Sequence, residues 1–251
     1  MPSKQVSDRA KADTSVRAAL SENEKKIVEG VLKQLGLAPE VISALLQAMS
    51  STLESATGTM VAADTAHMNE LGDDAAPRVE RDQQAERVAD ELSALRDAVT
   101  VAYGAPALRT LGFDGRTPVD PVQLQLLGSQ VVENLGKWKA PGPSRLPGFE
   151  LQPELWSAKL NAPLVSLSSA LEAVAREKRE ADTTLVAKNR AIEDWDKTFS
   201  LTATILSALL ELVGERELAR RVRPSRRRPG MTQGQADEVT QVTEEPAPAN
   251  G

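Results

Sequence analysis

The chain contains a single histidine, His67, with Asp64 and Glu70 three residues to either side. Imidazole and carboxylate groups at helical spacing can serve as metal ligands. Di-iron bundles, however, need a Glu-x-x-His motif on each of two helices, and one histidine cannot serve both. A Ser-His-Asp triad would have to use this one histidine, and the G-x-S-x-G motif that often carries the serine is absent. We therefore interpret His67 as a core histidine and expect neither a catalytic residue nor a metal site.

Acidic residues recur in pairs along the chain, and paired carboxylates can act as general acid and base. The pairs are Asp73-Asp74, Glu80 with Asp82, Asp90-Glu91, and Glu193-Asp194 with Asp196. Arg or Lys follows each pair within about a turn, which is typical of ion pairs on a solvated helix face. The chain also lacks cysteine and both glycine-rich phosphate-binding motifs, G-x-G-x-x-G and G-x-x-x-x-G-K-[ST]. These observations disfavour an enzyme and predict no cofactor.

The best binding candidate is an arginine cluster within residues 216–228, a segment that holds seven arginines and one acid. The arginines are Arg216, Arg220, Arg221, Arg223, Arg226, Arg227 and Arg228. Guanidinium groups bind phosphates and carboxylates in bidentate fashion, and Pro224 and Pro229 keep the segment out of a helix. The chain carries a net charge of −6, so the +6 of this segment leaves −12 on the rest. The cluster is a candidate contact for an anion or a partner; the alternatives are a basic end that complements a helix dipole or folds back on the acidic body.

The strongest structural signal is a heptad-like seam that runs from Leu160 to Val213. Thirteen of its sixteen positions, spaced alternately by four and three residues, are apolar. This pattern predicts a helix over 162–213, about 50 residues and about 75 Å long at 1.5 Å per residue. Lys178 and Lys188 interrupt the seam, and a solvent-facing midsection explains them more simply than an anion-binding channel.

The remaining helices are predicted from capping and stop signals. Residues 21–24 form a capping-box pattern, and Pro39 is typical of a first helical residue. Asp120 is an N-cap candidate followed by Pro121, and Gly214 is a C-terminal stop. The predicted helices span residues 22–35, 39–72, 77–104, 121–138, 162–213 and 215–222. Residues 139–153 are predicted as an extended strap because four prolines interrupt them.

These elements predict an all-α protein, an up-down-up-down four-helix bundle with unequal helices and coiled-coil-like packing. We expect a flexible N-terminus at residues 1–20, a single bundle over 21–222, and a C-terminal tail over 223–251 that is first basic and then disordered. Trp195 and Phe199, one turn apart on the seam, are expected to anchor the core.

The sequence predicts neither a secretory signal peptide nor a transmembrane helix. The first fifteen residues are polar and charged, unlike a secretory signal peptide. The most apolar window, residues 201–213, is too short for a bilayer and contains Glu211. We therefore predict a soluble cytoplasmic protein without a transmembrane segment.

The stretches LLELVGERELARRVRPSRRRPG at residues 209–230 and LGFDGRTPVDP at residues 111–121 resemble a group of uncharacterised helical-bundle proteins from high-GC bacteria. The resemblance covers about residues 30–230. It implies a bacterial helical bundle and supplies no activity, ligand or catalytic residue.

Three functional hypotheses follow from the sequence. The first is a non-enzymatic structural or interaction protein that contacts itself or another protein through helical surfaces. The second is a nucleic-acid or anionic-surface binder that acts through the arginine cluster. The third is a helical bundle that rearranges onto membranes through residues 201–213.

Overall fold

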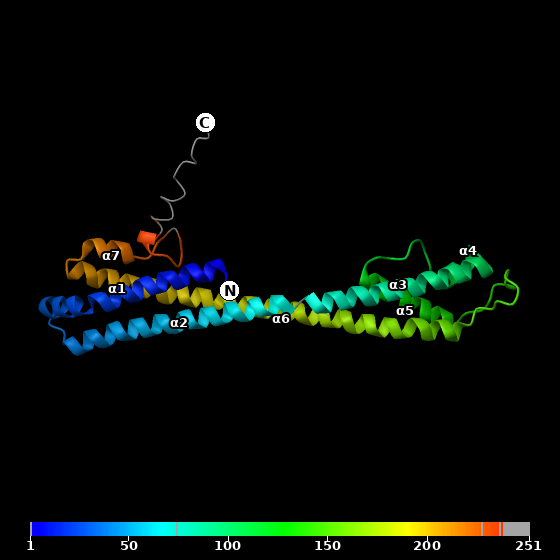
Figure 1. Cartoon of the computed structure of the whole chain (residues 1–251), viewed down its shortest axis with the longest axis horizontal. Helices are drawn as coiled ribbons and strands as arrows, with labels where there is room; N and C mark the ends of the chain where they lie inside the picture. The colour runs from blue at the N-terminus through cyan, green and yellow to red at the C-terminus, as the bar shows by residue number, and fades with distance from the viewer. Residues whose placement is uncertain (1, 74, 227, 236, 238–251) are drawn as a thin grey trace, which may run out of the picture. The chain divides into compact units, whose positions relative to one another are not determined.

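The computed structural model describes residues 2–73, 75–226, 228–235 and 237 (Figure 1). Its helices are α1 (Lys4–Leu35), α2 (Pro39–Asp73), α3 (Ala75–Tyr103), α4 (Ala105–Thr110), α5 (Pro121–Gly136), α6 (Pro153–Leu212) and α7 (Arg216–Val222). Among these described residues the only β-type pairing is an isolated bridge between Pro224 and Thr232. The predicted all-helical class is confirmed. No helix in the described part of the chain is long and apolar enough to cross a membrane.

The chain divides into two compact units, so the predicted single four-helix bundle is not confirmed. Unit 1 combines the residues up to Asn69 with those from Asp182 onward, and unit 2 comprises Glu70–Ala181. The division falls inside α2 and α6, whose seams read as continuous in the sequence. Each unit has a hydrophobic core of its own.

The core of unit 1 is formed where α1, α2 and the C-terminal part of α6 lie side by side, with α7 packed against them (Figure 1). Its fully buried side chains include Ile27 from α1, Leu53 from α2 and Leu206 from α6. Trp195 and Phe199 of α6 stack with their ring centroids 4.7 Å apart, and both are buried. The prediction that these two aromatic residues anchor the core is confirmed.

The core of unit 2 joins α3, α4, α5 and the N-terminal part of α6. Gly128 lets α5 approach α6 closely, because a Cβ at this position would lie 2.5 Å from Cδ2 of Leu164. The Asp120 side chain caps α5 by accepting a hydrogen bond from the Gln123 amide, as predicted for the Asp-Pro pair. Helix α4 was not predicted; its Ala107 is buried in this core.

Two predicted boundaries are wrong. Helix α1 begins at Lys4 and runs through Ser21, because Val6, Val16 and other apolar residues upstream extend its buried face. Helix α6 begins at Pro153, where proline occupies a first helical position, and contains Asn161 in its interior. Within the predicted strap before α6, the Arg145 amide donates to the carbonyl of Ala102 at the end of α3, 2.8 Å away.

The glycine stops behave as predicted. Gly36 and Gly214 adopt positive φ angles of 68° and 90° at the ends of α1 and α6. The Gly36 amide donates to the Leu32 carbonyl, and the Glu215 amide donates to the Leu210 carbonyl. These bonds satisfy carbonyls at the helix ends that would otherwise lack partners.

Candidate functional site

The seven predicted arginines do not form one continuous tail. Arg216, Arg220 and Arg221 are exposed on α7, and Arg220 pairs with Glu217 of the same helix. Arg223 and Arg226 line a pocket in unit 1. Arg228 is half-buried, and Arg227 lies outside the described residues.

The segment that follows α7 folds back on unit 1. We define this C-terminal segment as residues 223–226 and 228–235. The Ser225 amide donates to the Met231 carbonyl at 2.7 Å, and the Gln233 amide donates to the Arg223 carbonyl at 2.8 Å. Thr232 between them is buried. The structure therefore differs from the prediction of disorder for residues 230–235; the remainder of the predicted disordered tail, residue 236 and residues 238–251, lies outside the described residues.

An ion pair between α1 and α6 supports this segment. Arg9 donates to both carboxylate oxygens of Asp196 in a bidentate pair, with distances of 2.9 and 2.8 Å. Gly230, at a φ of 78°, lies directly on this pair, because a Cβ there would come within 2.9 Å of atoms of Arg9 and Asp196. Only glycine combines that backbone angle with so close an approach.

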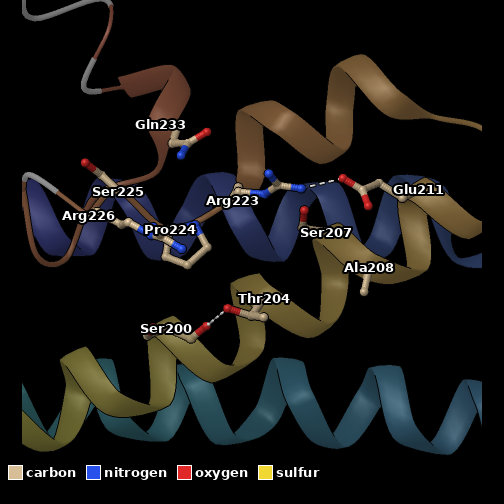
Figure 2. Close-up of a pocket in the computed structure, with 10 residues that line it drawn as sticks. All are labelled: Ser200, Thr204, Ser207, Ala208, Glu211, Arg223, Pro224, Ser225, Arg226 and Gln233. Carbon is tan, nitrogen blue, oxygen red and sulfur yellow. Dashed lines mark hydrogen bonds and ion pairs between the residues drawn. The ribbon is translucent and has the colours of Figure 1, made fainter.

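The pocket lies between α6 and the C-terminal segment and has a volume of about 570 Å³ (Figure 2). The α6 wall consists of Ser200, Thr204, Ser207, Ala208 and Glu211, and the wall from the C-terminal segment consists of Arg223, Pro224, Ser225, Arg226 and Gln233. Successive α6 residues of this wall are four, three, one and three positions apart, so they lie on one face of a helix with 3.6 residues per turn. The pocket combines two guanidinium groups with one carboxylate and several hydroxyl groups.

Arg223 and Glu211 join the two walls by an ion pair (Figure 2). Ser207 makes a second connection, because its buried hydroxyl donates to the Ala219 carbonyl of α7 at 2.9 Å. Arg226 is exposed and forms no ion pair with any residue that the structure describes.

His67 lies in the core of unit 1, as the sequence indicated. It is 7% exposed, and its Nδ1 lies 3.0 Å from the Thr184 hydroxyl. The carboxylate of Asp64, one turn from His67, is engaged by other groups. It pairs with Lys188 at 2.7 Å and accepts a hydrogen bond from the Ser3 amide at 2.6 Å. Burial acts to raise the pKa of Asp64, but the hydrogen bonds from Lys188 and Ser3 outweigh it and hold the pKa below its ordinary value.

This pair corrects the interpretation of one seam lysine. Lys178 is exposed, as a solvent-facing midsection predicts, but the Lys188 side chain is only 12% exposed. Its ammonium group is held by a carboxylate from α2 that sequence spacing alone does not connect to it.

A second buried acid, Asp13 of α1, was missed by the sequence reasoning. It is 1% exposed and pairs with Arg17 one turn along the helix at 3.0 Å. Burial raises the pKa of Asp13, and Arg17 and Thr57 offset only part of this effect. Thr57 also accepts a hydrogen bond from Nε1 of Trp195 at 2.7 Å, so α1, α2 and α6 meet in a polar layer within the core.

Within the described residues, one acidic group has metal-like spacing: Glu70, Glu177 and Glu180 of unit 2 have carboxylate oxygens within 4.8 Å of one another. Side chains of this type gather on helix surfaces without a metal, so the trio alone defines no site. Of the acidic pairs, Asp194 forms an ion pair with Lys197 three residues along the same helix, as expected. Asp82 pairs instead with the adjacent Arg81, and Asp196 pairs with the distant Arg9 of α1.

A separate exposed feature surrounds the turn between α1 and α2 in unit 1. Five large apolar side chains within fourteen residues are between 44% and 60% exposed: Leu32, Leu35, Leu37, Val41 and Leu45. We call them the turn patch. Apolar patches of a few hundred Å² are often interaction sites. This patch was not predicted from the sequence because its residues continue the apolar composition of the two helices.

Comparison with known proteins found no matching family model, no matching curated protein and no matching solved structure.

Proposed function

We propose that this chain is a non-enzymatic interaction protein that associates with a second copy of itself through the turn patch. The observation that carries the proposal is the gathering of Leu32, Leu35, Leu37, Val41 and Leu45 in exposed positions around one turn. Removing such side chains from water stabilises association by about 25 cal/mol per Å² of apolar surface before the costs of association are subtracted.

Charge complementarity favours a second copy as the partner. Lys33 and Glu40 are exposed within the turn patch, one on each side of the turn between α1 and α2, and neither forms an ion pair with a described residue. In a twofold-symmetric contact each surface meets its own copy, so Lys33 of one chain can face Glu40 of the other and the reverse. The turn patch has five apolar side chains, far fewer than the roughly 20–30 residues that each partner contributes to a standard interface, so we expect a reversible, concentration-dependent dimer.

Light scattering coupled to size-exclusion chromatography, run over a wide range of protein concentrations, tests this proposal. We expect Leu35→Glu and Val41→Glu to weaken dimerisation by roughly ten-fold or more, because each places a charge inside the apolar contact. Val186→Glu is the matched control, since Val186 is 68% exposed on α6 but does not belong to the turn patch. A chain that stays monomeric at every concentration, or a dimer that is insensitive to both patch variants, contradicts the proposal.

Charge reversal tests the proposed symmetry. Lys33→Glu should weaken the dimer, and the double variant Lys33→Glu/Glu40→Lys should restore it, because the pairing is exchanged between the two sides. If the double variant is as weak as the single variant, Lys33 and Glu40 do not face each other. Flotation with phosphatidylcholine vesicles asks whether the turn patch binds lipid instead; flotation that Leu35→Glu abolishes, without any dimer, would identify a membrane-surface protein.

A second candidate function is the binding of nucleic acid or another polyanion by α7. Its support is the row of exposed Arg216, Arg220 and Arg221, of which only Arg220 pairs with an acid among the described residues. Phosphate contacts of this kind weaken steeply as salt concentration rises. Fluorescence anisotropy with single-stranded and double-stranded DNA, compared between the native chain and Arg216→Ala/Arg221→Ala, tests it. Binding without salt dependence, or equal binding by the variant, rejects it.

A further inference from the structure

We infer that the pocket between α6 and the C-terminal segment binds a small molecule with a phosphate group at one end and hydroxyl groups at the other, such as a sugar phosphate. The inference rests on the hydrogen-bonding capacity of the two pocket walls. It is independent of self-association through the turn patch.

The wall formed by the C-terminal segment presents donors. Arg226 has no acidic partner within the described part of the chain. The Ser225 hydroxyl oxygen accepts a hydrogen bond from the Arg228 amide at 3.2 Å, which leaves its own hydrogen available to donate. The Gln233 side chain forms no hydrogen bond with a described residue, so its amide hydrogens are also available. A guanidinium group beside hydroxyl and amide donors is the donor set that a phosphate group requires.

The α6 wall presents acceptors instead. The Thr204 hydroxyl donates its hydrogen to the Ser200 carbonyl at 2.7 Å. Its exposed oxygen therefore retains lone pairs but has no hydrogen left for a ligand. Glu211 adds a carboxylate. Acceptors of this kind recognise the hydroxyl groups of a ligand.

The pocket is large enough for both ends of such a ligand, and its walls are preformed. Its volume of about 570 Å³ lies in the range of pockets that hold small organic molecules, roughly 300–1,000 Å³. The hydrogen bonds from Ser225 to Met231 and from Gln233 to Arg223 fix the backbone of the donor wall. Arg223 is itself held by Glu211 across the pocket (Figure 2). Little ordering is therefore needed when a ligand binds.

The charge balance selects the phosphate end. Two arginines and one glutamate line the pocket, and the glutamate is already paired with Arg223. Arg226, at the donor wall, carries a positive charge that has no acidic partner among the residues that the structure describes. An uncharged polyol would leave this charge without a partner, and a cation would be repelled by it.

Ribose 5-phosphate is a suitable probe, with ribose and inorganic phosphate as its two halves. Two-dimensional ¹H–¹⁵N NMR of the full chain at constant ionic strength should show shifts of the Ser225 and Gln233 amides. Arg226→Ala should weaken binding of ribose 5-phosphate by roughly ten-fold or more, since it removes a charged, bidentate donor. Arg190→Ala is the matched control, because Arg190 is an exposed arginine on α6 that does not line the pocket. This control should bind as the native chain does.

Thr204→Val tests the acceptor wall, because it keeps the branched shape of the side chain and removes the hydroxyl oxygen. It should weaken binding of ribose 5-phosphate by about three-fold or more and leave the affinity for inorganic phosphate unchanged. Three results would overturn the inference: equal binding of ribose 5-phosphate by Arg226→Ala and the native chain, equal shifts with chloride at the same ionic strength, or inorganic phosphate binding as tightly as ribose 5-phosphate.

Discussion

The carboxylate of Asp64 lies 2.7 Å from the ammonium group of Lys188 in the interior of unit 1, where Asp64 has no exposed surface. The pair joins α2 to α6, and the Ser3 amide brings in the beginning of α1. Removing one partner of a buried ion pair leaves a charge without compensation, which is far more costly than removing both.

Lys188→Met is therefore expected to lower the free energy of unfolding by about 3–5 kcal/mol. The double variant Asp64→Leu/Lys188→Met should be less destabilised than Lys188→Met alone, although it leaves the Ser3 amide without its acceptor. Lys197→Met is the control: Lys197 pairs with Asp194 on the surface, and such pairs contribute about 0–1 kcal/mol. Urea denaturation followed by circular dichroism measures all three. Equal losses for Lys188→Met and Lys197→Met contradict the buried role of Lys188.

The two buried aspartates should give opposite dependences of stability on pH. The pKa of Asp13 is raised in the folded chain, so the native state binds more protons than the unfolded state between the two pKa values. The contribution of Asp13 to the free energy of unfolding therefore falls as pH rises through this window. The pKa of Asp64 is lowered, so its contribution is present above the unfolded pKa and is lost as pH falls through the folded pKa.

Urea denaturation at a series of pH values, on the native chain, Asp13→Asn and Asp64→Asn, separates the two effects. Relative to the native chain, Asp13→Asn should gain stability as pH rises, whereas Asp64→Asn should lose stability as pH rises. Parallel pH profiles for the two variants would show that the two carboxylates do not differ in this way.

Two helical glycines of unit 1 provide a matched test of packing. A Cβ on Gly30 would lie 2.3 Å from Cγ1 of Val213, whereas a Cβ on Gly58 would have no other atom within 4 Å. Gly30→Ala should cost about 1–3 kcal/mol by overpacking. Gly58→Ala should stabilise by about 0.5–1 kcal/mol, because alanine is the better helix former. Thermal unfolding of the two variants tests whether the melting temperature falls in Gly30→Ala and rises in Gly58→Ala. A melting temperature that rises in both would mean that α1 and the end of α6 are not in close contact.

The hydrogen bond from Trp195 to Thr57 gives a further prediction. Thr57→Val keeps the shape of the side chain but leaves the buried indole N–H without an acceptor, at a cost of about 1–3 kcal/mol. Thr57→Ser keeps the hydroxyl group and should lose less. Urea denaturation of the two variants tests this order, and the reverse order would indicate that the methyl group of Thr57 matters more than its oxygen.

The sequence predicted features that depend on neighbouring residues. Asp120 caps α5 and Gly214 ends α6 as expected, because caps and stops are formed by residues within one turn of each other. The beginning of α1 was missed although Val6, Leu20 and Ile27 are buried at multiples of seven residues. The intervening heptad position is occupied by Asp13, which pairs with Arg17. Because a charged residue interrupts the apolar pattern, the sequence alone does not reveal the repeat.

Features that depend on distant residues were not predictable in the same way. The seam of α6 is apolar in both units, so it does not reveal that different helices cover its two parts. The pocket depends on Gly230 lying against Arg9 and Asp196, and no periodic pattern in residues 223–235 indicates that contact. A segment rich in glycine, proline and polar residues resembles a disordered tail unless its backbone hydrogen bonds are known.

The division of the chain also implies an order of folding. Unit 2 is one uninterrupted stretch, Glu70–Ala181, whereas unit 1 is assembled from two stretches that this insertion separates. Contacts between residues close in sequence form faster than contacts that close long loops. During synthesis, α1 and α2 emerge long before the part of α6 that completes their core, while unit 2 can fold as soon as its own residues have emerged. The apolar faces of α1 and α2 therefore remain exposed during synthesis until the part of α6 that contains Trp195, Phe199 and Leu206 has been made.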